Sequence, residues 1–299
     1  MQDAPKRRRF RPARPARLTA GEPVVSAEAP RRARGIYILP NLFTTASLFC
    51  GFFAIVQAMN NRFEAAAVAT FIAMVLDGLD GRVARLTNTQ SAFGEQFDSL
   101  SDMVSFGAAP ALIMYEWSLR GLGKWGWLAA FIYCAGAALR LARFNTNIGV
   151  VDKRFFQGLP SPAAAALVVG LVWIVTDLRE TKWITAQPAD LAWVAWVFTV
   201  YAGLTMVSNA PFYSFKAFNL RRSVPFIAVL GVMLVFVLVS SDPPLVLFSL
   251  FVGYGLSGWA LWLWRLRSGR GLPWREGSAA PAAGTAPSAG DRPSGPPPA

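Results

Sequence analysis

Eight apolar segments, each long enough to cross a membrane, constrain the fold of this chain more than any other feature. A lipid bilayer offers the backbone no hydrogen-bonding partner, so a single segment can cross it only as an α-helix, which pairs its own N–H and C=O groups. The sequence therefore predicts an all-α, polytopic membrane helix bundle. The expected helices cover residues 40–60, 62–85, 92–118, 123–146, 160–177, 188–208, 223–240 and 243–265.

The composition supports a membrane protein and indicates a disordered segment at each end. Of the 299 residues, 54% are hydrophobic and 15% are charged, whereas soluble domains average roughly 25% charged residues. Residues 1–35 are rich in Arg, Pro and Ala, and residues 268–299 are rich in Pro, Ala, Gly and Ser. Such segments cannot bury enough apolar surface to fold, so we expect a disordered basic arm and a disordered tail.

The basic residues indicate how the bundle is oriented. Eight spans place both termini on one side, together with the loops near 82–91, 140–159 and 209–222. These regions hold 24 of the 29 Lys and Arg residues, which leaves five for the other side. Cytoplasmic loops are enriched in Lys and Arg, so both termini are expected on the cytoplasmic side of a bacterial inner membrane. The net charge of +12 is thus explained by topology and anionic lipid, and no nucleic-acid partner is expected.

The metal-binding residue types are unusually restricted. Histidine is absent, and the two cysteines, Cys50 and Cys134, lie apart in apolar segments. These facts exclude an imidazole base and a zinc site built from His and Cys. A metal site in this chain must use mostly carboxylate oxygens, which favours Mg²⁺ or Mn²⁺.

Four aspartates between residues 77 and 102 form the most informative pattern. Asp77 and Asp80 are spaced i, i+3, and Asp98 and Asp102 are spaced i, i+4, so each pair shares one face of a helix. At ~1.5 Å per residue, the first pair lies toward the inner end of the second predicted helix and the second pair near the start of the third. We expect the four carboxylates to meet in the cytoplasmic third of the bilayer.

Four carboxylates gathered in a membrane require cations, because like charges repel and an uncompensated ion is costly to desolvate. Two divalent ions would compensate them, neutralise a diphosphate and stabilise an in-line displacement. The alternative interpretation is that paired aspartates cap helices or lie among hydrated headgroups. The small residues Gly81 and Ala84 and the basic Arg85 favour a ligand site, since they permit close approach and attract phosphate.

These residues resemble the signature of the CDP-alcohol phosphatidyltransferases, D-x2-D-G-x2-A-R, then eight residues, then G-x3-D-x3-D, and the signature is complete here. The matching positions are Asp77, Asp80, Gly81, Ala84, Arg85, Gly94, Asp98 and Asp102. The resemblance covers about residues 36–222 and implies a catalytic six-helix core there. It leaves residues 223–267 as two additional C-terminal transmembrane helices.

The resemblance implies that a phosphatidyl group passes from a CDP-linked lipid to an alcohol and that CMP leaves. Asp77, Asp80 and Asp98 would hold Mg²⁺ or Mn²⁺, in a two-metal site. Asp102 would contact metal and act as the general base on the acceptor hydroxyl. The residues expected to line the CDP and diphosphate site are Asn41, Thr44, Gly81, Ala84, Arg85 and Gly94. Family members usually form homodimers through membrane helices, so a homodimer is expected.

Four further segments resemble the branch of the family that uses CDP-diacylglycerol as donor and L-serine as acceptor. They are PNLFTTASLFCG (40–51), LRLARFN (139–145), FQGLPSPAA (156–164) and MVSNAPFYSFK (206–216). Members often carry a basic residue where this chain has Ala210. The residues implied at the serine or phosphate are Arg140, Arg143, Gln157 and Gly158. Two arginines at i, i+3 equally suit a helix anchored on the positive side of the membrane.

Three alternatives remain open from the sequence. A sister enzyme would use the same chemistry with glycerol 3-phosphate or inositol phosphate as acceptor. A cation-coupled transporter would bind ions through the same carboxylates, although such sites usually lie near the bilayer midplane. An inactive scaffold is the third, and the presence of all four aspartates argues against it.

Overall fold

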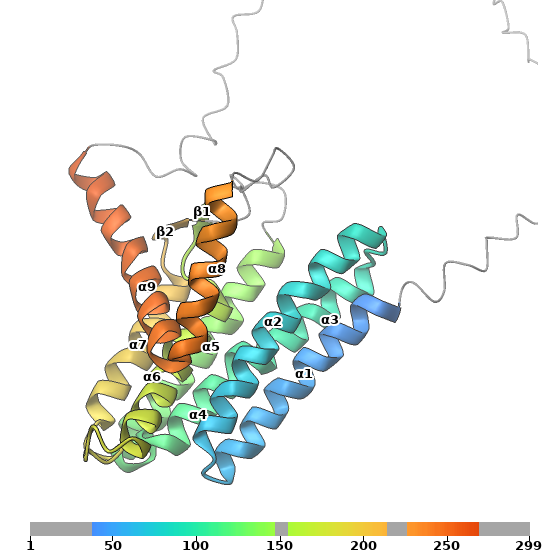
Figure 1. Cartoon of the computed structure of the whole chain (residues 1–299). Helices are drawn as coiled ribbons and strands as arrows, with labels where there is room; N and C mark the ends of the chain where they lie inside the picture. Colours follow the sequence, from blue (N-terminus) through green and yellow to red (C-terminus); the bar gives the residue numbers. More distant parts are fainter. Residues whose placement is uncertain (1–37, 147–154, 214–225, 269–299) are drawn as a thin grey trace, which may run out of the picture.

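A computed structural model describes residues 38–146, 155–213 and 226–268, and these are almost entirely helical (Figure 1). The predicted N-terminal arm, and the predicted tail apart from Ser268, lie outside the described residues. The helical elements are α1 (Ile38–Met59), α2 (Phe63–Thr87), α3 (Ala92–Asp102), the π-helix η2 (Met103–Ala108), α4 (Ala109–Trp117), the 3₁₀-helix η3 (Leu119–Leu122), α5 (Lys124–Thr146), α6 (Ser161–Glu180), α7 (Ala192–Val207), α8 (Phe226–Ser241) and α9 (Pro243–Arg267).

The eight predicted helical runs are confirmed, with two informative differences. The run at 92–118 is continuously helical, but a π-helical turn, η2, divides it into α3 and α4. The run at 188–208 begins later, at Ala192, since Asp190 accepts a hydrogen bond from the backbone N–H of Gln187 at 2.8 Å and stabilises a turn before the helix. Such an Asx-type contact competes with helix formation.

Four helices in the described part of the chain are long and apolar enough to cross a membrane: Pro40–Met59 within α1, then α5, α6 and α9. Helix α2 has 25 residues, but Asp77, Asp80, Arg82 and Arg85 lie in its second half and lower its hydropathy. Helices α7 and α8 have 16 residues each, fewer than the ~20 residues of a typical span. The helical elements and the four apolar helices of spanning length together confirm the predicted all-α membrane bundle.

Helix α6 forms the centre of the bundle and packs against α2, α4, α7 and α9. In its apolar window 72% of the residues are buried, whereas in α9 only 11% are. The run Ala163–Ala166 has side chains no more than 6% exposed, so neighbouring helices approach closely. This central helix joins the α1–α4 half of the molecule to α7 and α9 (Figure 1).

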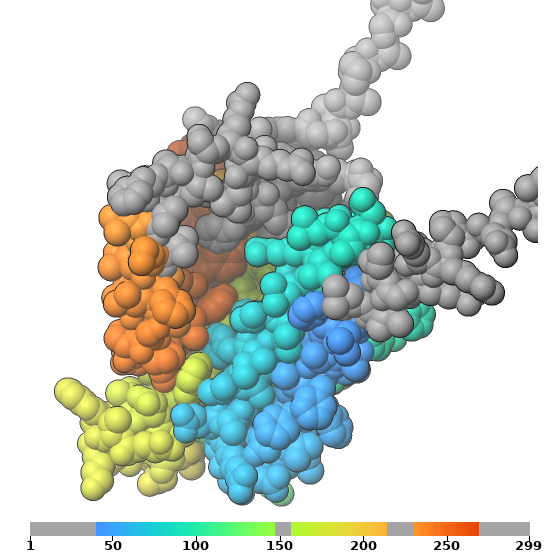
Figure 2. All heavy atoms as spheres, turned by 45° about the vertical axis from the view of Figure 1, so that its right-hand side comes forward, coloured from blue at the N-terminus to red at the C-terminus, as the bar shows by residue number. Residues whose placement is uncertain are grey.

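Helix α8 lies at one edge of the molecule, coloured orange in Figure 2. Its described side chains between Leu230 and Leu238 are apolar and exposed, with Phe236 72% exposed and Met233 62% exposed. An aqueous surface of this kind would be unfavourable, whereas a lipid-facing helix needs no polar face. The composition of α8 is thus that of a helix surrounded by lipid.

A short antiparallel pairing of β1 (Phe155–Gln157) with β2 (Pro211–Tyr213) was not expected. It brings the segments before α6 and after α7 together. Gly158 follows β1 with φ +75°, and its N–H donates to the Ala210 carbonyl at 2.9 Å. A side chain at this glycine would collide with the Met206 carbonyl oxygen, so the close approach requires glycine.

Helices α5 and α7 approach closely through Gly136 and Gly203. A methyl group at Gly136 would lie 2.5 Å from the Gly203 carbonyl oxygen, and one at Gly203 would lie 2.9 Å from Tyr133 Cα. Glycine pairs of this type let membrane helices pack through their backbones. The contact fixes α5, which carries Arg140 and Arg143, against α7.

We predict that Gly136→Ala destabilises the fold by about 1–3 kcal/mol, because the added methyl group forces two backbones apart. The measurement is thermal unfolding of the detergent-solubilised protein. Gly253→Ala on α9 is the matched control, since no atom lies within 4 Å of the added methyl group. Equal melting temperatures for the two variants would contradict this packing.

Candidate metal and nucleotide site

Three of the predicted aspartates form a compact group between the second half of α2 and the second half of α3. One carboxylate oxygen from each of Asp77, Asp98 and Asp102 lies within 4.8 Å of the others. The i, i+4 spacing on α3 places the second pair on one face, as the sequence predicts. Oxygens at these separations can share one cation, since Mg²⁺ binds oxygen at about 2.0–2.1 Å.

The hydrogen bonding of this group is incomplete in a way that suits a metal ion. Oδ1 of Asp98 and Oδ1 of Asp102 are buried and have no hydrogen-bond partner. A buried carboxylate oxygen without a donor is strongly unfavourable unless a cation compensates it. The donor set therefore fits a hard divalent cation.

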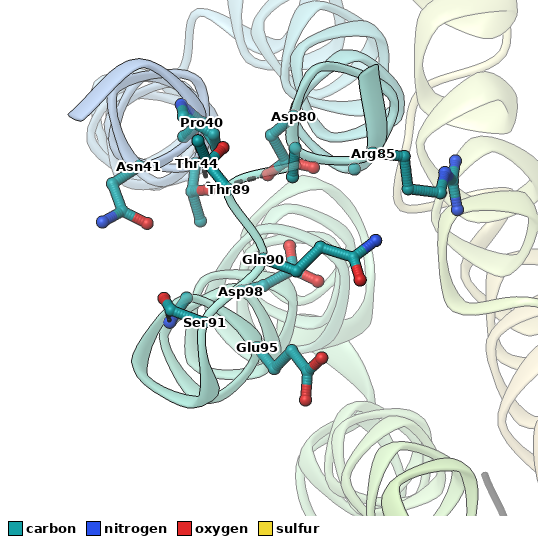
Figure 3. Close-up of a pocket in the computed structure, with 13 residues that line it drawn as sticks. Pro40, Asn41, Thr44, Asp80, Arg85, Thr89, Gln90, Ser91, Glu95 and Asp98 are labelled. Atoms are coloured by element: carbon teal, nitrogen blue, oxygen red, sulfur yellow. Dashed lines mark hydrogen bonds between the residues drawn. The ribbon is translucent and has the colours of Figure 1, made fainter. Parts of the chain in front are cut away.

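Asp80 has a different environment from the other three aspartates. Its side chain is 4% exposed, and its Oδ2 accepts a hydrogen bond from Thr44 Oγ1 at 2.7 Å. Figure 3 shows Asp80 and Asp98 projecting into the same space between α1, α2 and α3. Asp80 thus links the aspartate group to α1, and it lies outside the three-carboxylate cluster.

A cleft of about 180 Å³ opens beside Asp80 and Asp98. Its lining includes all six residues that the sequence assigns to the CDP site: Asn41, Thr44, Gly81, Ala84, Arg85 and Gly94. No atom lies within 4 Å of a methyl group built on Gly81, so this face of α2 is open to a ligand. The structure therefore brings the predicted nucleotide residues and two of the aspartates to one cleft.

Sequence reasoning missed five residues of the cleft lining, which are Pro40, Thr89, Gln90, Ser91 and Glu95. Three of them belong to the short connection between α2 and α3. Asn88 ends α2 in the left-handed conformation, and Ser91 begins α3 by accepting a hydrogen bond from the Gly94 N–H at 3.0 Å. The polar run T-N-T-Q-S between two helices signals this turn, although nothing in it indicates that the turn borders a ligand.

The four residues predicted at the acceptor lie apart from this cleft. Arg143 donates to the Val207 carbonyl at 2.9 Å and to Asn209 Oδ1 at 3.3 Å, so it holds the end of α7. Gln157 belongs to β1, and Gly158 is buried in the turn that follows it. These three residues shape the segment between α7 and β2.

Arg140 is the member of this set whose side chain keeps a buried donor without a hydrogen-bond partner. Its Nη1 donates to Ser161 Oγ at 2.7 Å, while its Nε is buried without a hydrogen-bond partner. An anionic group beside this side chain would satisfy the free donor.

The π-helix η2 begins immediately after Asp102 and ties the aspartate helix to its neighbours. Ser101 and Ser105 donate to the carbonyls of Thr44 and Ser47, each at 3.2 Å. The buried Tyr133 hydroxyl donates to the Phe106 carbonyl at 2.9 Å. Single π-helical turns occur frequently at functional sites, and this one fixes how α3 presents its carboxylates.

Comparison with known proteins agrees with this site. Residues 37–208 match the model of the CDP-alcohol phosphatidyltransferase family, and the chain belongs to that family. The family depends on divalent metal, and the aspartate group here could bind one. The chain is accordingly an integral membrane enzyme whose substrates are a CDP-linked lipid and an alcohol.

Several curated relatives are named CDP-diacylglycerol–serine O-phosphatidyltransferase. The protein of that name from Helicobacter pylori strain 26695 is 37% identical over 228 residues, which are 75% of this chain and 92% of the relative. The one from Mycobacterium tuberculosis strain H37Rv is 39% identical over 163 residues, 52% of this chain and 56% of the relative. The one from Saccharomyces cerevisiae is 35% identical over 151 residues, 46% of this chain and 54% of the relative.

We predict that Asp98→Asn weakens Mn²⁺ binding by at least about tenfold, because it removes a charge from the three-carboxylate group. Isothermal titration of the purified protein in detergent measures this affinity. Asp190→Asn is the control, since this aspartate lies in the turn before α7 and contacts Gln187. Equal Mn²⁺ affinities for the two variants would show that the group does not bind the metal.

Proposed function

We propose that this protein transfers the phosphatidyl group of CDP-diacylglycerol to the hydroxyl of L-serine, giving phosphatidylserine and CMP. The observation that carries the proposal is the juxtaposition of the unsatisfied carboxylates of Asp98 and Asp102 with the cleft lined by the family signature. The names of the relatives support serine as the acceptor.

In this proposal Asp102 is the general base. It takes the proton of the serine hydroxyl while the serine oxygen attacks the phosphorus that bears the diacylglycerol group. The bond from that phosphorus to the CMP oxygen breaks, and CMP leaves with the electron pair. The Oδ1 atom of Asp102 is buried at the end of α3, and positioning of the two reactants beside this base would lower the barrier.

Asp77, Asp80, Asp98 and Asp102 would hold Mg²⁺ or Mn²⁺, as a two-metal site. Bound metal would neutralise the diphosphate and stabilise the charge that develops during displacement. Three of these carboxylates converge. Asp80 accepts a hydrogen bond from Thr44 beside them, so it would help to hold a metal ion next to the three-carboxylate group.

The CDP group would occupy the cleft between α1, α2 and α3. Gly81 and Ala84 leave room for it on α2, and Gly94 does so on α3. Asn41 and Thr44 supply polar atoms from α1, and Arg85 supplies positive charge at the rim (Figure 3). This arrangement leaves the lipid chains of the donor free to extend into the bilayer.

On the acceptor side, Arg140 would bind the serine carboxylate. Its buried Nε, which has no hydrogen-bond partner, supports this role. Arg143, Gln157 and Gly158 would act indirectly, by holding the segment between α7 and β2 in place.

The proposal extends to topology and assembly. Residues 36–222 form the catalytic core, and residues 223–267 add two transmembrane helices. The distribution of Lys and Arg supports both termini and the active site on the cytoplasmic side of a bacterial inner membrane. A homodimer is proposed by analogy with the family.

We predict that the purified protein, given CDP-diacylglycerol, Mn²⁺ and labelled serine, forms labelled phosphatidylserine and an equal amount of CMP. Asp98→Ala should lower the rate at least about 100-fold, because the variant lacks a carboxylate that would hold the metal neutralising the diphosphate. Asp190→Asn should retain wild-type activity.

Parallel reactions with glycerol 3-phosphate and inositol phosphate identify the acceptor. Labelling of either compound in place of serine would assign the chain to a sister enzyme. Full activity of Asp98→Ala would contradict the metal role, and metal-dependent ion uptake without CMP release would indicate a transporter.

A further inference from the structure

An acidic side chain that the proposed metal site does not use lines the cleft for the CDP group. Glu95 borders this cleft together with Asp80 and Asp98, although the diphosphate of a CDP-linked lipid is itself negative. Bound metal would compensate the aspartates, whereas Glu95 is exposed and lies outside the three-carboxylate group. Like charges in one cleft repel, so Glu95 would weaken nucleotide binding unless it meets a group that donates hydrogen bonds.

The position of Glu95 on α3 separates it from the metal end of the cleft. It precedes Asp98 by three residues, so the two side chains lie on neighbouring turns of one face. At ~1.5 Å per residue, Glu95 is about 4.5 Å nearer the start of the helix. Gln90 and Ser91 border the cleft beyond it, before α3 begins. A diphosphate held by metal at Asp98 would leave the nucleoside to extend toward Glu95 and Gln90.

Local hydrogen bonds hold the backbone that carries these two side chains. The Thr89 N–H donates to the Ala84 carbonyl at 3.0 Å, and the Glu95 N–H donates to the Ser91 carbonyl at 3.1 Å. The Thr89 side chain is buried, and its hydroxyl lies 2.7 Å from that of Thr87. The connection between α2 and α3 therefore has a defined backbone at the wall of the cleft.

The side chains of Gln90 and Glu95 are available to a ligand. Both are exposed, and within the described residues no hydrogen bond or ion pair engages the Gln90 amide or the Glu95 carboxylate. Figure 3 shows them extending to the same side of the connection, whereas Asn41 lies on the other side, on α1. This part of the cleft thus offers an amide, which both donates and accepts, and a carboxylate, which only accepts.

The exocyclic amine of cytosine is the kind of donor that such a carboxylate binds. Uracil, like thymine, presents a carbonyl oxygen at that position, and a carboxylate repels it. We infer that Glu95 determines specificity for the base: its carboxylate accepts a hydrogen bond from the cytosine amine, and Gln90 pairs with the neighbouring ring atoms. The inference rests on the proposed function and names the residues that recognise the base of its donor. Neither residue belongs to the family signature.

Competition binding tests the role of Glu95 without turnover. Radiolabelled CDP bound to the detergent-solubilised protein with Mn²⁺ is displaced by unlabelled CDP or UDP, which gives the ratio of the two dissociation constants. The wild type should prefer CDP by at least about tenfold, because a hydrogen bond to a charged group is involved. Glu95→Gln should lower this preference at least about fivefold, since a neutral amide can also donate to the uracil oxygen. The ratio cancels any general effect of the lost charge on the diphosphate.

Glu64→Gln is the matched control, because Glu64 is also exposed and also lies in the first turn of a helix, at the opposite end of α2 from the cleft. It removes the same favourable interaction of a carboxylate with a helix N-terminus and should keep the wild-type preference. In a second measurement, Gln90→Ala should weaken CDP binding about threefold or more. Gln96→Ala should not, since Gln96 is exposed and lies outside the cleft lining.

Three results would overturn the inference. They are equal binding of CDP and UDP by the wild type, an unchanged preference in Glu95→Gln, and equal weakening of both nucleotides in that variant, which would place the carboxylate at the ribose. Unchanged CDP binding in Gln90→Ala would overturn the pairing with Gln90. Failure of the wild type to bind CDP with Mn²⁺ would overturn the nucleotide site of the proposed function instead.

Discussion

The structure depends on the electrostatic cost of gathering carboxylates inside a membrane. Buried oxygens of Asp98 and Asp102 have no hydrogen-bond partner, and one carboxylate oxygen from each of Asp77, Asp98 and Asp102 lies within 4.8 Å of the others. In a low-dielectric environment ionised carboxylates arranged in this way are strongly unfavourable, and bound cations or protons must compensate their charge. The helix bundle holds these oxygens close together, and a divalent ion would compensate their negative charge.

Several hydrogen bonds hold α1, α2 and α3 in place around the carboxylates. Ser101 and Ser105 tie α3 and η2 to carbonyls of α1, and Thr44 ties α1 to Asp80 on α2. The neighbouring cleft, in which the CDP group is proposed to bind, is lined by residues of α1, α2, α3 and the connection between α2 and α3. The residues proposed for the acceptor lie on α5 and in the segment of β1 and Gly158, outside the lining of this cleft.

The sequence predicted the features that depend on residue spacing. The eight helical runs follow from apolar length, and the convergence of Asp77, Asp98 and Asp102 follows from helical periodicity on two neighbouring helices. The β1–β2 pairing was missed because three-residue strands carry no usable periodicity. The packing of Arg143 on Val207, the π-helical turn after Asp102 and the contact of Tyr254 with β2 come from tertiary packing, and local sequence does not encode them.

The most direct test of the account is anomalous X-ray diffraction at the manganese edge from crystals grown with Mn²⁺ and CDP-diacylglycerol. The account predicts an anomalous peak bounded by the carboxylates of Asp77, Asp98 and Asp102, at distances typical of metal–oxygen bonds. Carboxylates that point apart, or no peak among them at saturating Mn²⁺, would contradict it.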